Sequence, residues 1–473
     1  MVYDAVIVGA GPAGLAAAAR LAHFGRRVCV LERQRRAGGL NTFYHRGGRW
    51  FDAGLHALTN WPASGAARSP WRFLMRQLRM RTEEFDPQPQ TMSEVIFPGA
   101  SLQFTNDPRF LEDQIAKRFP QRVDAYRRFV ADLPDYGALP AYGSGTARAA
   151  LEAALSDPRL INLLLWPVLC YGAATEDDMD YGMFVALFRS IFLEGLWRPR
   201  GGIRPLLEAL TRRIEEGGGE LRLGTAVREI RPAGRDGDGG GQSRRTRVIL
   251  DDDGVIETDS VLSSAGYRET MRLCGAREAA DRIPVGAISF FESVLFEVEG
   301  DCGSPGSEEE KRSVIFFHGP PEFGFRKPAG GVDFERGVVC CSEAFGDRDA
   351  VSPACPTIRI THLANHDFWA ELSAGEYKAR KREAFDRSIA TAARHAPRLR
   401  ARLSAGDTFT PRTIERYTAH AGGAVYGSPL KRPNGATAFP DVVLIGADQG
   451  GVGVVGALLS GVVMANQCLQ RAS

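Results

Sequence analysis

Residues Tyr3–Glu32, YDAVIVGAGPAGLAAAARLAHFGRRVCVLE, decide the fold of this chain. The stretch opens with an apolar run that is too short for a helix and is typical of a buried strand. An alanine-rich run follows the glycines and predicts a helix, which Gly25 ends. A second apolar run then ends on Glu32. The stretch therefore predicts a complete β-α-β unit with an acidic residue at its far end.

The glycines inside this unit have the spacing of a dinucleotide-binding fingerprint. The first glycine permits the tight turn, the second lets the backbone approach a pyrophosphate, and the third lets helix and strand pack closely. Free N–H groups at the start of the helix receive phosphates, and the acid accepts hydrogen bonds from a ribose. A glycine turn in an unrelated α/β domain would not require the second strand and the acid. The residues expected to bind here are Gly9, Gly11, Pro12, Ala13, Gly14 and Glu32.

Composition sets limits on size, partners and compartment. At 473 residues the chain predicts more than one domain, or one domain with a large insertion. The net charge of +2 gives no reason to expect a nucleic acid partner. Eight cysteines without a C-x-x-C pair indicate reduced thiols in a cytoplasmic protein and no metal site. The apolar N-terminus lacks the basic start of a signal peptide, and we expect no transmembrane helix.

The run after Glu32, ERQRRAGGLNTFYHRGGRWFDAGLHALTN, resembles the second signature of the FAD-dependent amine oxidase and phytoene desaturase superfamily. In that superfamily a basic residue and a Gly-Gly pair follow the acid, and an F-D-x-G segment lies beside the flavin. Many members have Arg after the Gly-Gly pair, where this chain has Leu40 and Asn41, so the pyrophosphate contact of that Arg must come from elsewhere or be absent. The resemblance implies cofactor contacts from Arg33, Gly38, Gly39, Leu40, Gly54, Leu55 and His56.

A second formal G-x-G-x-x-G, Gly451–Gly456, lies in the C-terminal stretch VVLIGADQGGVGVVGALLSG. Only 17 residues follow it, which leaves no room for a second strand and a ribose acid, so it is not a second dinucleotide domain. The superfamily closes over the same FAD with a strand, an acidic turn and a glycine-rich helix start. The resemblance therefore implies one non-covalent FAD, held also by Gly446, by the Asp448 carboxylate on the ribityl or phosphate side, and by the amides of Gly453 and Val454 at the flavin N1–C2 edge.

The chain returns to the cofactor domain in its middle. A helix with Leu206, Leu207, Leu210 and Ile214 on one face precedes a run, ELRLGTAVREI, that predicts one strand. By resemblance, Val227 meets the adenine through its backbone. Residues 231–247 predict a hairpin tip of a β-meander that returns to Ala265, another expected cofactor contact.

The fold class that follows is α/β: a Rossmann-type FAD-binding domain with a β-meander, plus a discontinuous α+β substrate domain, the arrangement of two-dinucleotide-binding-domain flavoproteins. We expect FAD-binding segments at residues 1–95, 199–285 and 429–473, and substrate-domain segments at residues 96–198, largely helical, and 286–428. The apolar helices between Leu160 and Trp197 are either packed core or the lining of a tunnel for a long apolar substrate. Residues Trp71–Arg81 are either an interfacial helix on anionic lipid or an ordinary helix with a basic face.

The segment GDTFTPRTIERYTAHAGGAVYGSP, Gly406–Pro429, is similar to phytoene desaturases, carotenoid isomerases and retinol saturases. That resemblance implies desaturation, saturation or isomerisation of carbon–carbon bonds in a long apolar unsaturated substrate, such as a carotenoid or another polyprenoid. No acid–base pair is needed if the polyene stabilises its own carbocation. His56 and Tyr426 are the catalytic candidates near the flavin, and a packed histidine and a structural tyrosine are the alternatives.

Two other functions remain open. A flavin amine oxidase on a small amine usually places a lysine near the flavin, and only Lys311 and Lys327 lie in the expected region. A non-enzymatic prenyl-chain carrier of the same fold would not need the intact pyrophosphate glycines. Because a long polyene cannot cross water unaided, we expect peripheral contact with a membrane through Trp71–Arg81 and the apolar helices. The sequence leaves the substrate, the reaction direction, the electron acceptor and the oligomeric state open.

Overall fold

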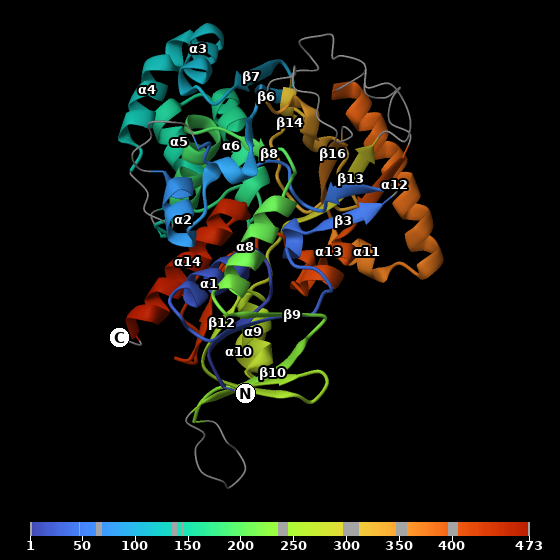
Figure 1. Ribbon diagram of the computed structural model, residues 1–473. Coiled ribbons are helices and arrows are strands. Elements are labelled where there is room, and N and C mark those ends of the chain that lie inside the picture. Colours follow the sequence, from blue (N-terminus) through green and yellow to red (C-terminus); the bar gives the residue numbers. More distant parts are fainter. Residues whose placement is uncertain are drawn as a thin grey trace.

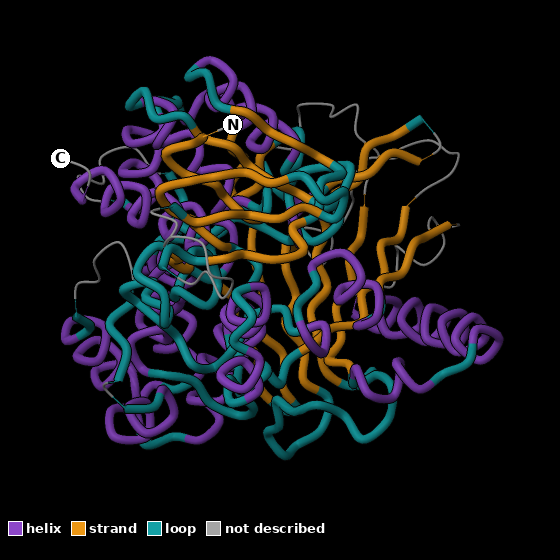
Figure 2. Tube along the Cα trace, turned by 90° about the horizontal axis from the view of Figure 1, so that it is seen from below, coloured by secondary structure: helices purple, strands orange, loops and turns teal. Residues whose placement is uncertain are grey.

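Two seven-stranded sheets form the framework of the protein (Figure 1). The computed structural model describes residues 2–46, 48–62, 69–134, 140–143, 145–234, 245–296, 312–346, 357–395 and 405–471. In Figure 1 the first sheet occupies the lower half of the molecule and the second sheet the upper right, with helices α3 to α6 beside it. Figure 2 shows strands of both sheets from below. The predicted α/β class is confirmed.

The first sheet contains the N-terminal unit that the sequence predicts. Its strands follow the order β10-β11-β12-β1-β2-β9, and β18 pairs with β12. Strand β1 (Val2–Val8), helix α1 (Pro12–His23) and strand β2 (Val28–Glu32) form the β-α-β unit, with β1 and β2 parallel. A Cβ on Gly14 would lie 1.9 Å from the Gly9 carbonyl oxygen. Only glycine therefore allows α1 to start so close to the preceding turn.

The C-terminal segment completes the same layer. Strand β18 (Val442–Leu444) runs parallel to β12 (Val255–Ser263), and helix α14 (Gly453–Arg471) packs along α1. A Cβ on Gly461 would lie 2.1 Å from the Ala13 carbonyl oxygen, so the two helices cross at close range. Helix α8 (Arg204–Glu216) covers the other side of α1 and buries the predicted apolar face. The start of α14 and the turn after β1 thus lie close together, and they come from opposite ends of the sequence.

Helix α14 corrects one expectation. Its segment Gly453–Gln470 has a mean hydropathy of 1.3 and is long and apolar enough, by length and composition, to cross a membrane. The sequence was expected to contain no such run, and that prediction was wrong. Half of the segment is buried inside the protein, where it packs against α1. Its apolar character is explained by this packing between cofactor-domain elements.

The β-meander differs from the prediction in one strand. The run ELRLGTAVREI forms two strands, β9 (Glu220–Leu223) and β10 (Val227–Arg231). Gly224, at φ +67°, turns the chain between them, so β9 extends the parallel sheet on β2 while β10 pairs antiparallel with β11 (Thr246–Leu250). The predicted hairpin around Asp253 joins β11 to β12. Residues 235–244 of the predicted hairpin tip lie outside the described residues.

The second sheet has the order β17-β13-β16-β15-β14-β6-β7 and collects strands from three distant parts of the chain. Its first strand in the sequence, β6, begins at Met92, slightly before the predicted boundary between the segments 1–95 and 96–198. The predicted domain boundaries stay a proposal. The strands are β6 (Met92–Phe97), β7 (Ala100–Phe104), β13 (Ser289–Phe296), β14 (Arg312–His318), β15 (Arg336–Cys341), β16 (Thr357–Ala364) and β17 (Ala405–Phe409).

The segment at residues 96–198, predicted to be a largely helical part of the substrate domain, is mostly helical. It forms α3 (Pro108–Arg118), α4 (Val123–Asp132), α5 (Ala147–Leu155), α6 (Pro158–Gly172) and α7 (Tyr181–Phe188). The remaining helices and short strands are α2 (Pro70–Leu78), α9 (Tyr267–Leu273), α10 (Arg277–Asp281), α11 (His366–Glu371), α12 (Ala374–His395), α13 (Pro411–Thr418), β3 (Phe43–Arg46), β4 (Arg49–Asp52), β5 (Pro87–Pro89) and β8 (Trp197–Pro199).

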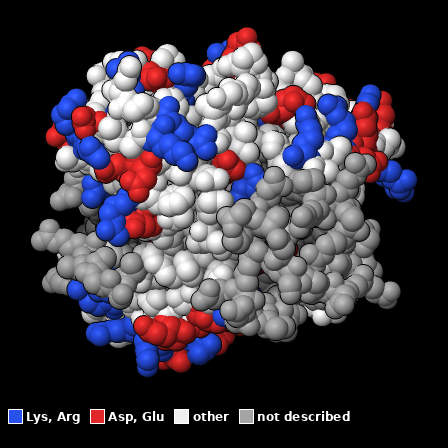
Figure 3. Space-filling model, turned by 90° about the horizontal axis from the view of Figure 1, so that it is seen from above, with Lys and Arg blue, Asp and Glu red and all other residues white. Residues whose placement is uncertain are grey.

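The surfaces predicted to meet a membrane are buried. Trp71 is fully inaccessible, and its indole Nε1–H donates to Thr82 Oγ1 at 3.1 Å. Most side chains of α6 and α7 belong to one hydrophobic core. The interfacial role of Trp71–Arg81 and of these helices was therefore wrong. Most of their apolar side chains pack in the core, and Tyr171 of α6 and Leu187 of α7 also line the cleft described below. On the face seen from above, charges of both signs are interspersed (Figure 3). Membrane contact stays a prediction, with no surface assigned to it.

Candidate active site

A cleft of about 1600 Å³ opens where the carboxyl ends of β1 and β2 face the second sheet. Typical ligand pockets measure roughly 300–1,000 Å³, so the cleft has room for a dinucleotide and a second molecule. Most predicted site residues line it: Gly9, Gly11, Pro12, Ala13, Glu32, Arg33, Gly39, Leu40, Gly54, Leu55, His56, Val227, Ala265, Tyr426, Gly446, Gly453 and Val454. Gly14, Gly38 and Asp448 do not line it.

Two helices begin at this cleft, and both are suited to an anionic ligand. Helices α1 and α14 have no acidic residue in their first turns, and the start of α1 has no side-chain cap. Cβ atoms built on Gly11 and Gly453 would meet nothing within 4 Å, so the backbone at both starts is open to the cleft. Unsatisfied N–H groups and the helix dipole favour phosphate at such ends. The residues present therefore fit FAD.

Glu32 is held in place at the end of β2. Its carboxylate accepts hydrogen bonds from the backbone N–H groups of Ala10, at 2.9 Å, and Gln34, at 2.8 Å. These bonds fix the carboxylate beside the glycine turn, and the remaining lone pairs suit the predicted ribose contact. Many superfamily members have an arginine at the position of Leu40. In this chain the lining of the cleft contains several other arginines: Arg33, Arg35, Arg36, Arg228, Arg272 and Arg277.

The Asp448 carboxylate lies outside the lining of the cleft and joins three chain segments. It accepts from the backbone N–H groups of Tyr267, at 2.6 Å, and Ser428, at 2.7 Å. The ammonium group of Lys431 lies 3.9 Å from it and donates to the Tyr426 carbonyl at 2.6 Å. Burial lowers the pKa of Lys431 to about 8. These contacts show that the Asp448 carboxylate holds neighbouring chain segments together. A direct hydrogen bond from Asp448 to the cofactor stays a prediction.

One end of the cleft, which we call the apolar end, is walled by Tyr171, Leu187, Phe290, Val425, Tyr426 and Val452. The Tyr426 hydroxyl donates to the Cys170 carbonyl, so its proton is committed to helix α6. The Tyr171 ring stacks on His56 with centroids 5.8 Å apart. The Tyr171 hydroxyl is buried and has no hydrogen-bond partner among the described residues, which leaves a donor for a ligand in the cleft.

His56 reaches from the apolar end into the second sheet. Its Nε2 lies 2.7 Å from Thr361 Oγ1, and the Thr361 hydroxyl donates to Glu292 Oε1 at 3.0 Å. Arg359 Nη1 donates to the other Glu292 oxygen at 2.8 Å. Burial, followed by the nearby Arg359 and Arg198, lowers the pKa of His56 well below its usual 6.5. Burial raises the pKa of Glu292, and Arg359 opposes that rise.

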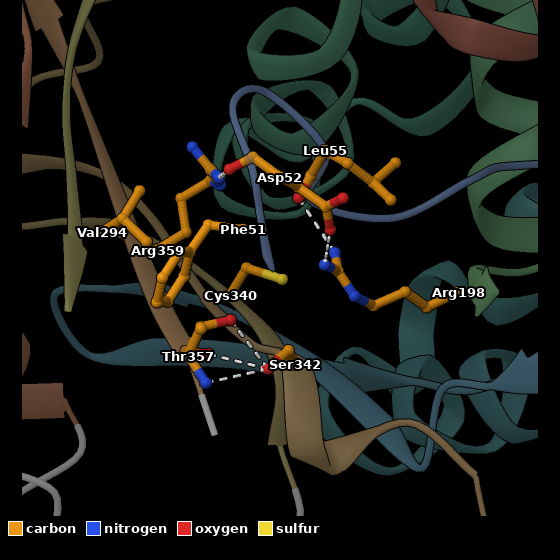
Figure 4. Close-up of a pocket in the computed structure, with 9 residues that line it drawn as sticks. All are labelled: Phe51, Asp52, Leu55, Arg198, Val294, Cys340, Ser342, Thr357 and Arg359. Carbon is orange, nitrogen blue, oxygen red and sulfur yellow. Dashed lines mark hydrogen bonds and ion pairs between the residues drawn. The ribbon is translucent and has the colours of Figure 1, made fainter. Parts of the chain in front are cut away.

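Two arginines hold the loop that carries His56 (Figure 4). Arg198 forms an ion pair with Asp52 and donates to the carbonyls of Leu55, at 2.9 Å, and His56, at 2.7 Å. Arg359 donates to the carbonyls of Ala53, at 2.6 Å, and Asp52, at 2.5 Å. In Figure 4 the two side chains approach Asp52 from opposite sides of a cavity of about 10 Å³, which is close to the space that one water molecule requires.

Sequence reasoning missed Glu292, Arg359, Arg198, Thr361 and Tyr171. One signal was available for the first two, because SFFESVLF and TIRITHLA are apolar strands that each contain a single charged residue. A charge in such a run is rarely buried without a partner, so each strand pointed to an ion pair. Nothing in the sequence paired these two residues with each other or with His56.

Comparisons with known proteins agree with this geometry. The family model of the flavin containing amine oxidoreductases matches residues 12–289. A phytoene desaturase (lycopene-forming) from Pseudescherichia vulneris is 25% identical over 96% of this chain and 96% of its own length. The all-trans-retinol 13,14-reductase of Danio rerio is 23% identical over 99% of this chain and 86% of its own length.

The fold is also that of a solved amine oxidase. Wild-type putrescine oxidase bound to putrescine superposes with a TM-score of 0.63 at 17% identity, over the full length of both chains. Identity this low supports the fold alone. The family model, in contrast, covers more than half of this chain and includes helix α1, Glu32 and the His56 loop. The chain therefore belongs to the family of flavin containing amine oxidoreductases and is an FAD-dependent oxidoreductase.

Proposed function

We propose that the protein binds one non-covalent FAD and oxidises, reduces or isomerises carbon–carbon bonds of a long, apolar, unsaturated substrate of the carotenoid or polyprenoid class. The observation that carries the proposal is the apolar end of the cleft, whose walls are aliphatic and aromatic. Such walls favour a hydrocarbon over a charged amine. The phytoene desaturase and retinol reductase relatives act on compounds of this class, which supports the proposal.

The residues of the chain have separate tasks in this function. The starts of α1 and α14 receive the anionic parts of the cofactor, and Glu32 receives a ribose. Bound there, the flavin supplies a two-electron acceptor or donor for hydride transfer. The apolar walls exclude water from the reacting carbons, and the loop held by Arg198 and Arg359 keeps His56 beside them.

The flavin amine oxidase on a small amine remains the second candidate, because the solved putrescine oxidase has the same fold. Among the described residues that line the cleft there is no lysine. Lys327 is about half exposed and pairs with Asp367 at 2.9 Å, and Lys311 lies outside the described residues. Lys431 is buried behind Tyr426 and is not part of the lining. These placements favour the hydrocarbon substrate.

Acid precipitation of the purified protein is expected to release about one FAD per chain, because a single Rossmann unit serves the cleft. The supernatant is measured by absorbance and mass spectrometry, and the pellet by fluorescence. Flavin that stays with the pellet would contradict the non-covalent link and direct attention to His56 or a cysteine. A protein purified without any flavin, and unable to bind added FAD, would favour the prenyl-chain carrier.

Anaerobic mixing with a reducing substrate is expected to bleach the bound flavin. Phytoene in detergent or liposomes tests the oxidation direction, and putrescine tests the amine alternative under the same conditions. For the reverse direction, chemically reduced protein is mixed with a more unsaturated polyene, and return of the oxidised flavin spectrum is followed. Bleaching by the amine, with no response to any polyene in either direction, would move the assignment to the amine oxidases.

A further inference from the structure

A continuous line of hydrogen bonds connects the apolar end of the cleft to a buried ion pair in the second sheet. It runs from His56 Nε2 through the Thr361 hydroxyl to Glu292 Oε1, while Arg359 binds Glu292 Oε2. His56 and Glu292 line the cleft, and Thr361 and Arg359 lie behind them. Phe290 and Glu292 are two residues apart on strand β13, so their side chains emerge on the same face of the sheet.

The direction of each hydrogen bond follows from the donors available. Both oxygens of Glu292 accept a hydrogen bond, one from Arg359 and one from Thr361. The only hydroxyl hydrogen of Thr361 is therefore used, and its oxygen must accept from His56 Nε2–H. A neutral imidazole carries one N–H, so Nδ1 holds a lone pair. Nδ1 has no hydrogen-bond partner among the residues that the structure describes.

The charges around His56 keep the ring neutral. Two guanidinium groups, those of Arg359 and Arg198, add to burial in lowering its pKa well below 6.5. The other titratable groups near the ring are Tyr171 on α6, Cys340 on β15, Glu292 on β13 and Asp52 at the end of β4. Burial raises the pKa of Tyr171 and raises that of Cys340 to about 11. Neither group therefore competes with His56 as a proton acceptor at neutral pH.

We propose that Nδ1 of His56 exchanges a proton with the substrate, and that Thr361 and Glu292 are positioning residues that hold the ring in the tautomer with this nitrogen free. The inference rests on the proposed function. In the oxidation direction one C–H bond gives its proton to Nδ1, and its electron pair becomes the new C=C π bond. The adjacent C–H bond supplies the hydride that the flavin accepts, and reduction of the substrate is the reverse. The imidazolium charge is offset by Glu292 through Thr361.

The Glu292→Gln substitution is expected to reverse this line of hydrogen bonds. The introduced amide keeps its carbonyl oxygen toward Arg359, because two sets of donors cannot face each other. Its NH₂ group then donates to Thr361 Oγ1, and the Thr361 hydroxyl turns to donate to His56 Nε2. The imidazole proton must move to Nδ1, which removes the free lone pair from that nitrogen. The Thr361→Val substitution breaks the line, and Thr361→Ser preserves it.

Nitrogen-15 NMR of the imidazole rings tests these tautomers without any substrate. The FAD-loaded protein is labelled at its eight histidines, and the His56 signals are assigned by their loss in His56→Gln. Wild type and Thr361→Ser are expected to show Nε2 protonated and Nδ1 free, and Glu292→Gln the opposite. Glu94→Gln is the matched control, because Glu94 pairs with Arg312 at 2.8 Å in the same sheet and is equally buried. It should leave the His56 signals unchanged.

Rates of flavin bleaching by phytoene provide the second measurement. Thr361→Val and Glu292→Gln are expected to slow bleaching by about 10–100-fold, as is typical of groups that orient an imidazole, with recovery in Thr361→Ser. A wild-type ring with Nδ1 protonated, or a tautomer that Glu292→Gln leaves unchanged, would overturn the inference. Bleaching that is unaffected by His56→Gln would also overturn it. A wild-type protein with the expected tautomer, whose flavin no polyene reduces or re-oxidises while putrescine bleaches it, would instead contradict the proposed function.

Discussion

Replacing Arg359 with alanine is expected to lower the free energy of unfolding by about 3–5 kcal/mol, because removing one partner of a buried ion pair leaves the other charge unpaired. The Arg359 side chain is 6% exposed, and it is the partner of Glu292. It also donates to the carbonyls of Asp52 and Ala53. The same substitution should therefore release the loop before His56 and weaken FAD retention. Chemical denaturation and equilibrium dialysis against FAD measure the two effects.

Arg312→Ala is the matched control for this variant. Arg312 is 11% exposed and pairs with Glu94 at 2.8 Å in the same sheet, but it does not line the cleft. We expect a comparable loss of stability with FAD affinity unchanged in the folded protein. If Arg359→Ala destabilises the protein by less than about 1 kcal/mol, the pair is not the buried interaction that the structure describes. If both variants lose FAD equally, the loss reflects general unfolding and not the loop.

The Gly453→Asp variant is expected to lose FAD. Gly453 begins helix α14 at φ +69°, and a Cβ there would meet nothing within 4 Å, so the new side chain has room to enter the cleft. Two like charges roughly 4 Å apart repel by about 4 kcal/mol at an effective dielectric constant of 20, which corresponds to roughly 1,000-fold weaker binding of an anionic cofactor. FAD affinity and the spectrum of the bound flavin are the measurements.

Two controls separate charge from backbone strain. Gly453→Asn has nearly the same shape without the charge and should retain most of the affinity. Gly25→Asp places the same side chain at φ +70° in open space at the far end of α1. It should carry the same left-handed backbone strain with FAD binding intact. A Gly453→Asp protein that keeps normal flavin chemistry but loses affinity for NADPH would contradict the assignment of this helix to the flavin.

Short sequence patterns were sufficient to predict those parts of the fold that depend on contacts between residues close together in the chain. Gly9, at φ +94°, permits the turn, and Gly14 permits the helix start beside the Gly9 carbonyl oxygen, only five residues away. The pattern of a strand, an acidic turn and a glycine-rich helix start predicted that α14 closes the first domain, and α14 packs along α1. The prediction of a single strand for ELRLGTAVREI was wrong, because Gly224 adopts a left-handed backbone conformation and turns the chain there.

Burial was the property that the sequence did not decide. Trp71 and the residues of α6 have the composition of either a membrane-facing or a core helix, and packing against the rest of the chain places them inside. Helix α14 shows the same ambiguity, because it is apolar enough to cross a membrane but packs on α1. Hydrophobicity measures the tendency to leave water and does not identify which apolar surface receives the side chain.

The sequence by itself determined the β-α-β unit, the closing helix and the flavin family, and it predicted His56 as a site residue, which the structure places in the lining of the cleft. Only the tertiary structure decided what surrounds His56. Thr361 and Glu292 lie 305 and 236 positions away from it, on two neighbouring strands of the second sheet. Strand pairing between distant segments brings these groups within hydrogen-bonding distance, and neither periodicity nor spacing carries that information. The cofactor site is therefore readable from local sequence, whereas the chemistry at its apolar end is created by the folding of the second sheet.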